Sequence, residues 1–166
     1  MKFRQARLTD LPAAAAILRD AARRMLAEGK CQWSESYPRE EHVLADIERG
    51  VAYVMVGDDG RVVGYSAVVF TGEPAYDDLD GEWLSDGDYV VAHRVAVAQD
   101  SQCRGIGGMI FAAIEHLAAG RGIGSFRIDT NFDNERMISL LGRCGFAFTG
   151  LVHYPQGERR AYEKLI

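Results

Sequence analysis

Four segments of the chain have apolar residues every three or four positions, which is the spacing of a helix with one buried face. The first helix is expected to begin at Thr9 or Asp10, either of which can cap it, and to end near Gly29. A second is expected from Pro38 to Gly50. The other two are expected where Ile110, Ile114 and Leu117 share one face, and over residues 134–143.

Runs of β-branched and aromatic residues predict strands. The expected strands are Lys2–Arg7, Ala52–Val56, Arg61–Phe70, Tyr89–Ala98, Ser125–Thr130, Phe146–His153 and Arg159–Leu165. The resulting order of elements, β-αα-βββ-α-β-α-ββ, predicts an α/β fold in which a mixed sheet carries helices on both faces.

Composition limits the class of protein further. The chain has 166 residues, of which 48% are hydrophobic and 26% charged, values typical of one globular domain over residues 1–166. Its formal net charge of −5 disfavours a nucleic-acid-binding protein, because such proteins usually present a basic face. No apolar run approaches the roughly 20 residues that a membrane-spanning helix needs, so no membrane partner is expected.

The cysteines and the first residues favour a cytoplasmic protein. Cys31, Cys103 and Cys144 form no Cys-x-x-Cys pair, which disfavours a disulfide framework and a zinc site. The histidines also lack metal-ligand spacing, so no bound metal is expected. The first ten residues contain no apolar stretch typical of a secretory signal.

The clearest chemical signal is an expected strand that runs into a glycine-rich turn and then into a helix. Gly105, Gly107 and Gly108 stand at this turn, directly after Arg104. Glycine permits positive φ and lets a ligand approach the backbone closely. The free N–H groups and the dipole of the following helix favour an anion, and Arg104 adds a cation. We therefore expect a phosphate site, for which a pyrophosphate is the natural ligand.

Two common phosphate motifs do not match this turn. A Walker A loop needs Lys and then Ser or Thr after its glycines, and the dinucleotide fingerprint fails at its third glycine, where Ile110 stands. The pattern that matches is Gln/Arg-x-x-Gly-x-Gly, with Gln102, Gly105 and Gly107 at the defined positions. A glycine-rich turn without a ligand is the alternative interpretation.

This pattern, followed by Asn134 and then by Gly145-Phe146 at the end of the next helix, resembles the GNAT superfamily of N-acetyltransferases. The resemblance covers nearly the whole chain and extends to bacterial acetyltransferases whose acceptors are mostly unassigned. It implies a GNAT-like fold with a mostly antiparallel sheet of about six or seven strands. The sheet would splay apart between the strands at residues 89–98 and 125–130.

The resemblance also implies how acetyl-CoA would bind. The backbone of residues 95–97 would pair with the pantetheine arm like an added strand, and the turn would wrap the pyrophosphate. The cofactor-binding residues it implies are Val95, Ala96, Val97, Gln102, Cys103, Arg104, Gly105, Ile106, Gly107, Gly108 and Asn134. For Asn134, a helix N-cap is an equally good interpretation.

His93 is the candidate general base that would deprotonate the amine. Alternation along the strand places Val91, His93, Val95 and Val97 on one face, which is the face of the expected thioester. An imidazole with an ordinary pKa near 6.5 suits proton removal at neutral pH. The alternative is a structural histidine that is hydrogen-bonded within the sheet, for example to Asp129.

One family feature is missing. The tyrosine that commonly protonates the departing thiolate falls on Leu141, which has no proton to donate. Cys144 and Tyr154 are the candidate substitutes, and departure of the thiolate without a proton donor is a third option because the pKa of a thiol is modest. A covalent acyl-cysteine at Cys103 is disfavoured, since that residue lies at the pyrophosphate end.

Two segments are expected to receive the acceptor. One carries Trp33 and Tyr37 in a polar loop, and the other, Thr71–Asp88, carries Tyr76 and Trp83 among seven carboxylates with no Lys or Arg. Aromatic rings beside carboxylates such as those of Asp80 and Glu82 suit a cationic amine. The alternative is that the acids form a solvated loop and the aromatics anchor it to the core.

The sequence therefore predicts an acyl-CoA-dependent N-acetyltransferase that moves an acetyl group to a small amine by direct attack in a ternary complex. Two other functions stay open at this point. One is a catalytically silent acyl-CoA sensor, and the other is acetylation of protein lysines or N-termini. The resemblance also leaves a homodimer open.

Overall fold

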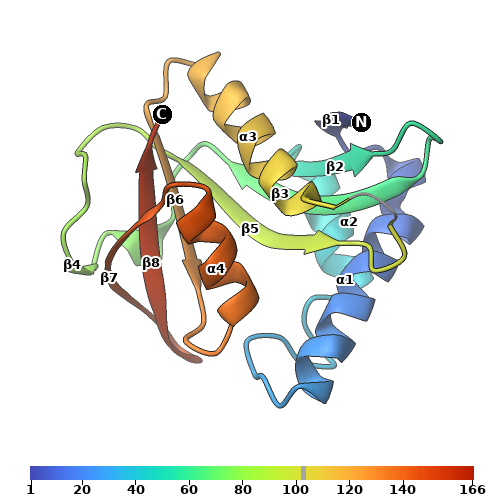
Figure 1. Cartoon of the computed structure of the whole chain (residues 1–166), viewed down its shortest axis with the longest axis horizontal. Helices are drawn as coiled ribbons and strands as arrows, with labels where there is room; N and C mark the ends of the chain where they lie inside the picture. The colour runs from blue at the N-terminus through green and yellow to red at the C-terminus, as the bar shows by residue number, and fades with distance from the viewer. Residues whose placement is uncertain (102–103) are drawn as a thin grey trace. The chain divides into compact units, whose positions relative to one another are not determined.

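The computed structural model describes residues 1–101 and 104–166. Over these residues the chain forms eight strands, four α-helices and two short 3-10 helices (Figure 1). In chain order they are β1 (Lys2–Gln5), η1 (Leu8–Asp10), α1 (Leu11–Ala27), α2 (Glu40–Glu48), β2 (Ala52–Val56), β3 (Val62–Val69), η2 (Pro74–Tyr76), β4 (Asp80–Gly81), β5 (Val90–Val97), α3 (Ile106–Ala119), β6 (Ser125–Thr130), α4 (Glu135–Arg143), β7 (Ala147–Tyr154) and β8 (Gly157–Leu165). In these ranges no helix is long and apolar enough to cross a bilayer.

The described strands form one sheet in the order β1-β2-β3-β5-β6-β8-β7-β4. β5 and β6 run parallel, with Val90 opposite Phe126 and Val91 opposite Arg127. The pairs β1–β2, β2–β3, β6–β8, β7–β8 and β4–β7 are antiparallel. The expected mixed, mostly antiparallel sheet is therefore confirmed, and the splay of residues 89–98 from 125–130 stays a prediction.

The sheet has one strand more than the six or seven expected. The additional strand is β4, which has only two residues, Asp80 and Gly81, and pairs with Leu151 and Gly150 of β7. Sequence pattern misses it because it contains no β-branched or aromatic residue. Its pairing depends on backbone contact instead.

The second helix begins two residues later than expected. Its start is fixed at Arg39, whose backbone N–H donates to Nδ1 of His42 at 2.9 Å. The imidazole, at the third position of α2, therefore accepts the N–H of the N-cap residue, which is the role that a Glu or Gln side chain commonly has there. Pro38, the residue expected to open the helix, follows a cis peptide bond instead.

The chain divides into two compact units, and each is built from two stretches of sequence. The first unit contains Met1–Val68 and His93–Ile110, and the second contains Val69–Ala92 and Phe111–Ile166. The single domain expected over residues 1–166 stays a prediction.

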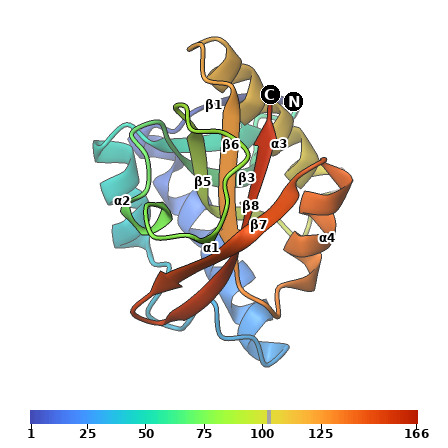
Figure 2. The same cartoon turned by 90° about the vertical axis from the view of Figure 1, so that its left-hand side faces the viewer.

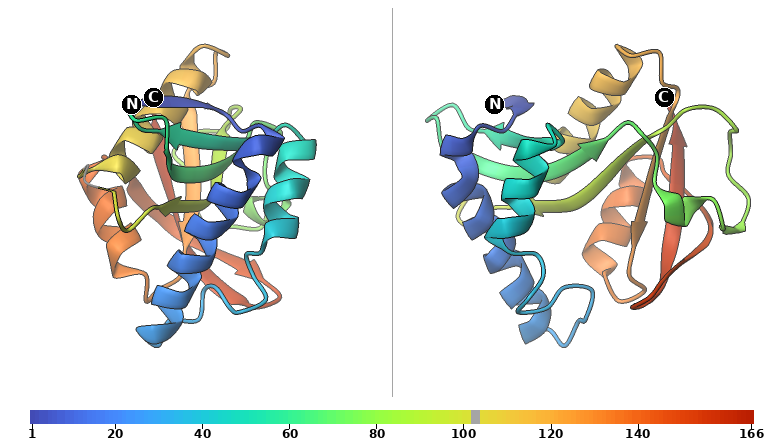
Figure 3. Two further views of the ribbon diagram at one scale, coloured as in Figure 1. Left: turned by 90° about the vertical axis from the view of Figure 1, so that its right-hand side faces the viewer. Right: turned by 180° about the vertical axis from the view of Figure 1, so that it is seen from behind.

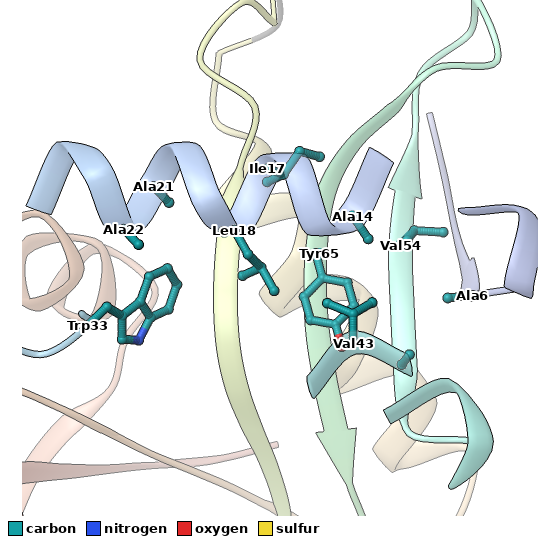
Figure 4. Packing of buried hydrophobic residues seen from close by; sticks show 12 residues of the cluster. Ala6, Ala14, Ile17, Leu18, Ala21, Ala22, Trp33, Val43, Val54 and Tyr65 are labelled. Atoms are coloured by element: carbon teal, nitrogen blue, oxygen red, sulfur yellow. The ribbon is translucent and has the colours of Figure 1, made fainter. Parts of the chain in front are cut away.

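The core of the first unit lies between the sheet and the first two helices. Figure 3 shows α1 and α2 side by side over one face of β2 and β3. The apolar stripe of α1, which includes Leu18 and Ala22, packs with Trp33, Val54 and Tyr65 (Figure 4). Leu18 and Ala22 are four residues apart, which is the spacing of apolar residues from which the sequence predicts this helix.

The other face of the first unit is covered by the start of α3. A Cβ atom on Gly64 would lie 2.8 Å from Cδ1 of Ile110 and 3.4 Å from Cγ2 of Ile106. The glycine in β3 therefore makes room for α3 directly against the strand. Helices on both faces, as expected, are confirmed in this unit.

The second unit has an aromatic core on one face of its strands. The rings of Phe111, Phe126 and Phe146 lie within 5.0–5.6 Å of one another, centroid to centroid. The other face is covered by residues 71–88, here called the acidic segment. Figure 1 shows the acidic segment and α4 on opposite sides of β7 and β8, and Figure 2 views the face that the segment covers.

Gly81 and Gly150 permit the close approach of β4 to β7, and this gives a testable prediction. A Cβ on Gly150 would lie 2.2 Å from the carbonyl oxygen of Asp80, and the residue has φ near +151°. We expect Gly150→Ala to release β4, because neither the space nor the backbone conformation admits a side chain. Hydrogen exchange should show this as lost protection of the Glu82 amide, which donates to the carbonyl of Thr149.

Gly142→Ala in α4 is the matched control. A Cβ there would meet no atom within 4 Å, so it should stabilise the protein slightly, by about 0.5–1 kcal/mol, without changing exchange in β4. Equal protection of Glu82 in both variants would contradict the assignment of β4 to backbone contact.

Candidate active site

In the first unit, β5 leads into a turn and then into α3, as the sequence predicts. Gly105 adopts a left-handed conformation with φ near +78° and is followed by Ile106, the first residue of α3. At the start of this helix the N–H of Met109 donates a hydrogen bond to the carbonyl oxygen of Gly105 at 3.1 Å. N–H groups in a first helical turn have no partner within their helix, so this end of α3 suits an anion. Arg104 is exposed beside it.

A surface ion pair holds the start of the same turn. Nη2 of Arg61 lies 2.6 Å from Oδ2 of Asp100, and this bond lowers the pKa of the Asp100 carboxyl. Because the carboxylate is paired, its charge is partly neutralised near the proposed phosphate site. Gln102 and Cys103, which the family pattern assigns to cofactor binding, lie outside the described residues.

The strand itself is irregular at Arg94. This residue has φ near +54°, and among the described residues other than glycine it is the only one with positive φ. Positive φ is disfavoured for residues with a Cβ atom. The alternation that places His93 and Val95 on one face assumes an extended residue between them, so that argument is wrong at this point. The role of His93 as general base stays a prediction.

The Arg94 side chain points to a buried carboxylate on α2. Its Nε and Nη2 donate to Asp46 at 2.9 and 2.6 Å, which is the two-pronged geometry that favours arginine. Asp46 also accepts bonds from Tyr65 at 2.6 Å and Arg49 at 2.6 Å. Its side chain is 1% exposed, so the charge is compensated almost entirely by protein groups.

The network extends to Tyr37 in the connection between α1 and α2. Nη1 of Arg94 donates to the Tyr37 hydroxyl at 2.9 Å. Burial opposes the charge on Arg94, but Tyr37 and Asp46 outweigh this effect and raise its pKa. Burial, with the Asp46 charge next, raises the pKa of Tyr65. Arg94 is therefore a permanent cation that joins α2, β3 and the α1–α2 connection to β5.

In the second unit, two phenols share one carboxylate. The hydroxyls of Tyr76 and Tyr154 donate to Oδ2 of Asp129 at 2.8 and 2.9 Å, and Arg159 donates to Oδ1 at 3.3 Å. Burial first, and the charge of Asp129 second, raise the pKa of Tyr154. A hydroxyl already committed to a carboxylate is a weak proton donor to a thiolate, which disfavours Tyr154 as the missing acid.

A second buried carboxylate anchors the acidic segment. Glu163 of β8 accepts hydrogen bonds from Ser125 at 2.6 Å, Ser85 at 2.7 Å and Arg127 at 3.2 Å, and from the backbone N–H of Leu84. Burial alone would raise the pKa of Glu163, but these donors outweigh burial and lower it. The Arg127 guanidinium also stacks 4.3 Å from the ring centroid of Trp83.

Comparisons with known proteins agree with this geometry. The model of the Acetyltransferase (GNAT) family matches residues 16–146. The chain belongs to the GNAT acetyltransferase family. Membership makes it an acetyltransferase and implies acetyl transfer that depends on acetyl-CoA.

Solved GNAT structures resemble the chain over nearly its whole length. A GNAT acetyltransferase from Streptococcus agalactiae is 30% identical, with a TM-score of 0.84 and coverage of 99% of this chain and 95% of that one. One from Listeria monocytogenes is 23% identical, with a TM-score of 0.77 and coverage of 99% and 94%. A GNAT phosphinothricin acetyltransferase from Sinorhizobium meliloti, solved with AcCoA, is 15% identical, with a TM-score of 0.72 and coverage of 99% and 88%. The last two support the fold alone, and no curated protein matches the chain.

Several expected site residues of this GNAT chain also have structural roles. Asn134 caps α4 by accepting a bond from the Met137 N–H at 3.3 Å, which confirms the helix N-cap interpretation. Leu141 is fully buried, and Cys144 forms the C-cap of α4. The assignments of Asn134 to cofactor and of Cys144 to proton donation stay predictions.

The aromatic residues expected beside the acceptor are mostly anchored. Trp33 belongs to the core of the first unit, and Tyr76 to a core cluster of the second. Tyr76, Glu82 and Trp83 nevertheless line one hollow of about 390 Å³. Asp80 and Glu82 are exposed. The structure therefore supports anchoring for Trp33 and Tyr76, while contact with an acceptor stays a prediction for the whole set.

Sequence reasoning missed the Arg94–Asp46 pair and the Glu163 anchor. A signal was present in each case, since Arg94 and Glu163 are charged residues inside expected strands. Charges within strands are seldom buried without a partner, so each indicated a partner elsewhere in the chain. The identity of that partner could not be read from spacing, because the partners are far apart in sequence.

The Glu163 anchor gives a prediction for stability. Its side chain is 0% exposed and that of Arg127 is 6% exposed, so Glu163→Gln leaves a buried cation without its counter-charge. We expect a loss of about 3–5 kcal/mol of unfolding free energy at neutral pH, measured by urea denaturation. Because the pKa of Glu163 is lowered by folding, the contribution is present above the unfolded pKa, about 4.3, and disappears as pH falls through the lower folded pKa.

Glu158→Gln in the same strand is the control. Glu158 is 53% exposed and lies 3.4 Å from His153, so its loss should change stability by less than about 1 kcal/mol. A Glu163→Gln effect no larger than this control, or one independent of pH, would refute the anchor.

Proposed function

We propose that this GNAT chain is an N-acetyltransferase that moves the acetyl group of acetyl-CoA to a small cationic amine by direct attack in a ternary complex. The observation that carries the proposal is the left-handed Gly105, which directly precedes α3 in the connection from β5 and has the exposed Arg104 beside it. In this proposal the first-turn N–H groups of α3 and Arg104 hold the pyrophosphate. The backbone of Val95–Val97 pairs with the pantetheine arm.

The residues of β5 divide the chemistry between them. The imidazole of His93 accepts the ammonium proton, and the N–H of Val95 donates to the thioester carbonyl as negative charge develops on its oxygen. A nitrogen–carbon bond forms first, and the carbon–sulfur bond of the adduct then breaks. The sulfur leaves as a thiolate, and the second proton that the nitrogen loses as the amide forms passes to solvent. Protonation by the residue at position 141 is not part of the proposal, since leucine has no proton to give.

The acidic segment supplies the preference for a cationic acceptor. Four of its carboxylates, those of Glu73, Asp77, Asp86 and Asp88, line a hollow of about 500 Å³ in the second unit. Carboxylates gathered around a concave surface raise the local concentration of cations. The proposal also keeps the cytoplasmic location that the cysteine pattern favours.

A silent acyl-CoA sensor is the second candidate, and two observations favour it. Leu141 is buried where the family commonly has an acidic hydroxyl. Tyr154, the other hydroxyl considered, is committed to Asp129. A sensor would bind CoA and release none from acetyl-CoA with any amine.

Binding and turnover separate these candidates. Millimolar CoA should stabilise the protein by several kcal/mol if its Kd is in the low micromolar range, which a thermal shift measures. Free CoA is then titrated after incubation with acetyl-CoA and a panel of polyamines, amino acids, aminoglycosides and arylalkylamines. Release with a small amine supports the proposal, and release only with peptides supports protein acetylation. Binding without release supports the sensor, and an unchanged Tm rejects all three.

With an acceptor identified, His93→Ala should lower kcat/KM by about 10²–10⁴-fold at neutral pH. The Kd of CoA should change little, because the imidazole is not part of the phosphate site. His116→Ala at the exposed end of α3 is the control and should leave both values unchanged. Normal turnover in His93→Ala would remove this residue from the mechanism.

Charge in the acidic segment gives an independent prediction. Asp80→Asn combined with Glu82→Gln should raise the KM of a cationic acceptor by roughly tenfold at low ionic strength, and should make KM less sensitive to salt. Asp20→Asn with Glu48→Gln, on the exposed surfaces of α1 and α2, makes the same change in net charge elsewhere. Equal KM values in the two double variants would show that the segment is only solvated.

A further inference from the structure

Arg94 lies between the two residues of β5 that the proposed chemistry uses, and it is held from outside the strand. We propose that Arg94 and Asp46 are a positioning pair for acyl transfer, in which their ion pair holds the left-handed turn of β5 that orients His93 and Val95. This inference rests on the proposed function of those two residues. It adds that an ion pair outside the reacting groups is needed to orient them.

The backbone strain is confined to Arg94, and three nitrogen atoms of its guanidinium are held by hydrogen bonds. A residue with a Cβ atom at φ near +54° returns to extended backbone unless other interactions prevent it. Here the two nitrogen atoms Nε and Nη2 are fixed on the two oxygens of Asp46, and Nη1 is fixed on Tyr37. Because successive side chains of an extended strand alternate between faces, straightening the backbone at Arg94 would pull the guanidinium off these partners.

The far end of the restraint is itself rigid. Besides Arg94, Asp46 binds the hydroxyl of Tyr65 in β3 and the guanidinium of Arg49. It is one of the buried residues of α2. The carboxylate therefore cannot follow Arg94 if the strand relaxes. The turn in β5 is fixed against α2 and β3 together.

The same guanidinium reaches the α1–α2 connection. Tyr37 and Ser34 form an isolated bridge, with backbone bonds of 2.8 and 3.3 Å, so the bond from Arg94 to the Tyr37 hydroxyl fixes this hairpin-like loop. Tyr37 is one of the residues proposed to contact the acceptor. Loss of the pair should therefore affect the acceptor as well as the chemical step, and should affect the phosphate site at α3 least.

A second ion pair in the first unit, with a buried carboxylate and a partly exposed arginine, provides the control. Arg4 donates to Asp10 at 2.7 and 2.9 Å, and Asp10 is buried. This pair is also a two-pronged arginine–carboxylate pair, here through Nη1 and Nη2. It joins β1 to η1, and among the described residues it has no hydrogen bond to β5. Asp10→Asn therefore reproduces the loss of a buried carboxylate's ion pair at a site that the reaction does not use.

The experiment compares Asp46→Asn with Asp10→Asn in the full chain. NMR chemical shifts and HN–Hα couplings of residues 93–95 report the backbone of the turn without any ligand. Calorimetry with CoA, and kcat and KM with the amine found in the release panel, report function. In Asp46→Asn we expect the couplings at Arg94 to move toward extended values, kcat to fall at least tenfold, acceptor KM to rise and the Kd of CoA to stay within threefold. Asp10→Asn should lower Tm but leave the couplings and kcat within twofold.

Two substitutions at Arg94 keep the proposal testable if Asp46→Asn fails to fold. Both Arg94→Gly and Arg94→Ala remove the cation, but glycine tolerates positive φ, so Arg94→Gly should retain at least threefold more kcat than Arg94→Ala. The proposal is overturned if Asp46→Asn keeps the couplings and kcat, if Asp10→Asn loses as much kcat, or if glycine and alanine are equal. Failure of the wild-type chain to bind CoA would instead overturn the proposed function, while the couplings would still decide whether the pair holds the turn.

Discussion

The first unit depends on a charge that is expensive to bury. Moving a carboxylate out of water costs several kcal/mol, and proteins recover this only when nearly every lone pair is satisfied. Asp46 achieves this with four hydrogen bonds, from Arg94, Tyr65 and Arg49. Arg94 lies in β5, Tyr65 in β3 and Arg49 at the C-cap of α2, so the carboxylate can be satisfied only when α2, β3 and β5 are in place together. Apolar packing by α1 brings these elements close, whereas the charge selects one arrangement of them.

The second unit uses the same physics for a different purpose. The acidic segment packs Tyr76, Leu79 and Trp83 on the sheet, but its carboxylates repel one another. It is fixed from beneath by buried polar groups of β6 and β8, in which Glu163 receives Ser85 and Arg127 stacks against Trp83. The segment can therefore keep its own carboxylates on the surface, because its attachment does not use them. The charges that hold the segment, on Glu163 and Arg127, are thus different from the carboxylates that the segment itself exposes.

The sequence was sufficient to predict the order of elements, the mixed sheet and the turn at Gly105, because each depends on local periodicity or on a local backbone requirement. It was insufficient for β4, whose two residues Asp80 and Gly81 have no strand pattern and pair through contact alone. It was misleading at Arg94, since alternation assumes extended backbone and a distant carboxylate enforces another conformation. The bond from the Arg39 N–H to His42 at the start of α2 shows the same limit at smaller scale, because Glu or Gln is the usual acceptor at that position. The roles of His93 and of the acceptor residues depend on bound molecules and stay predictions.

The contact between β4 and β7 has a consequence for how such a chain can vary. Gly81 and Gly150 face each other so closely that a side chain on either would collide with the backbone of the other strand. A replacement at one position cannot be compensated by a replacement at the other, since the obstacle is main chain, which no substitution removes. The contact between β4 and β7 therefore requires glycine at both positions. Loss of either glycine would therefore separate β4 from β7, while the contacts of Ser85 and Trp83 with β8 and β6 would still hold the rest of the acidic segment.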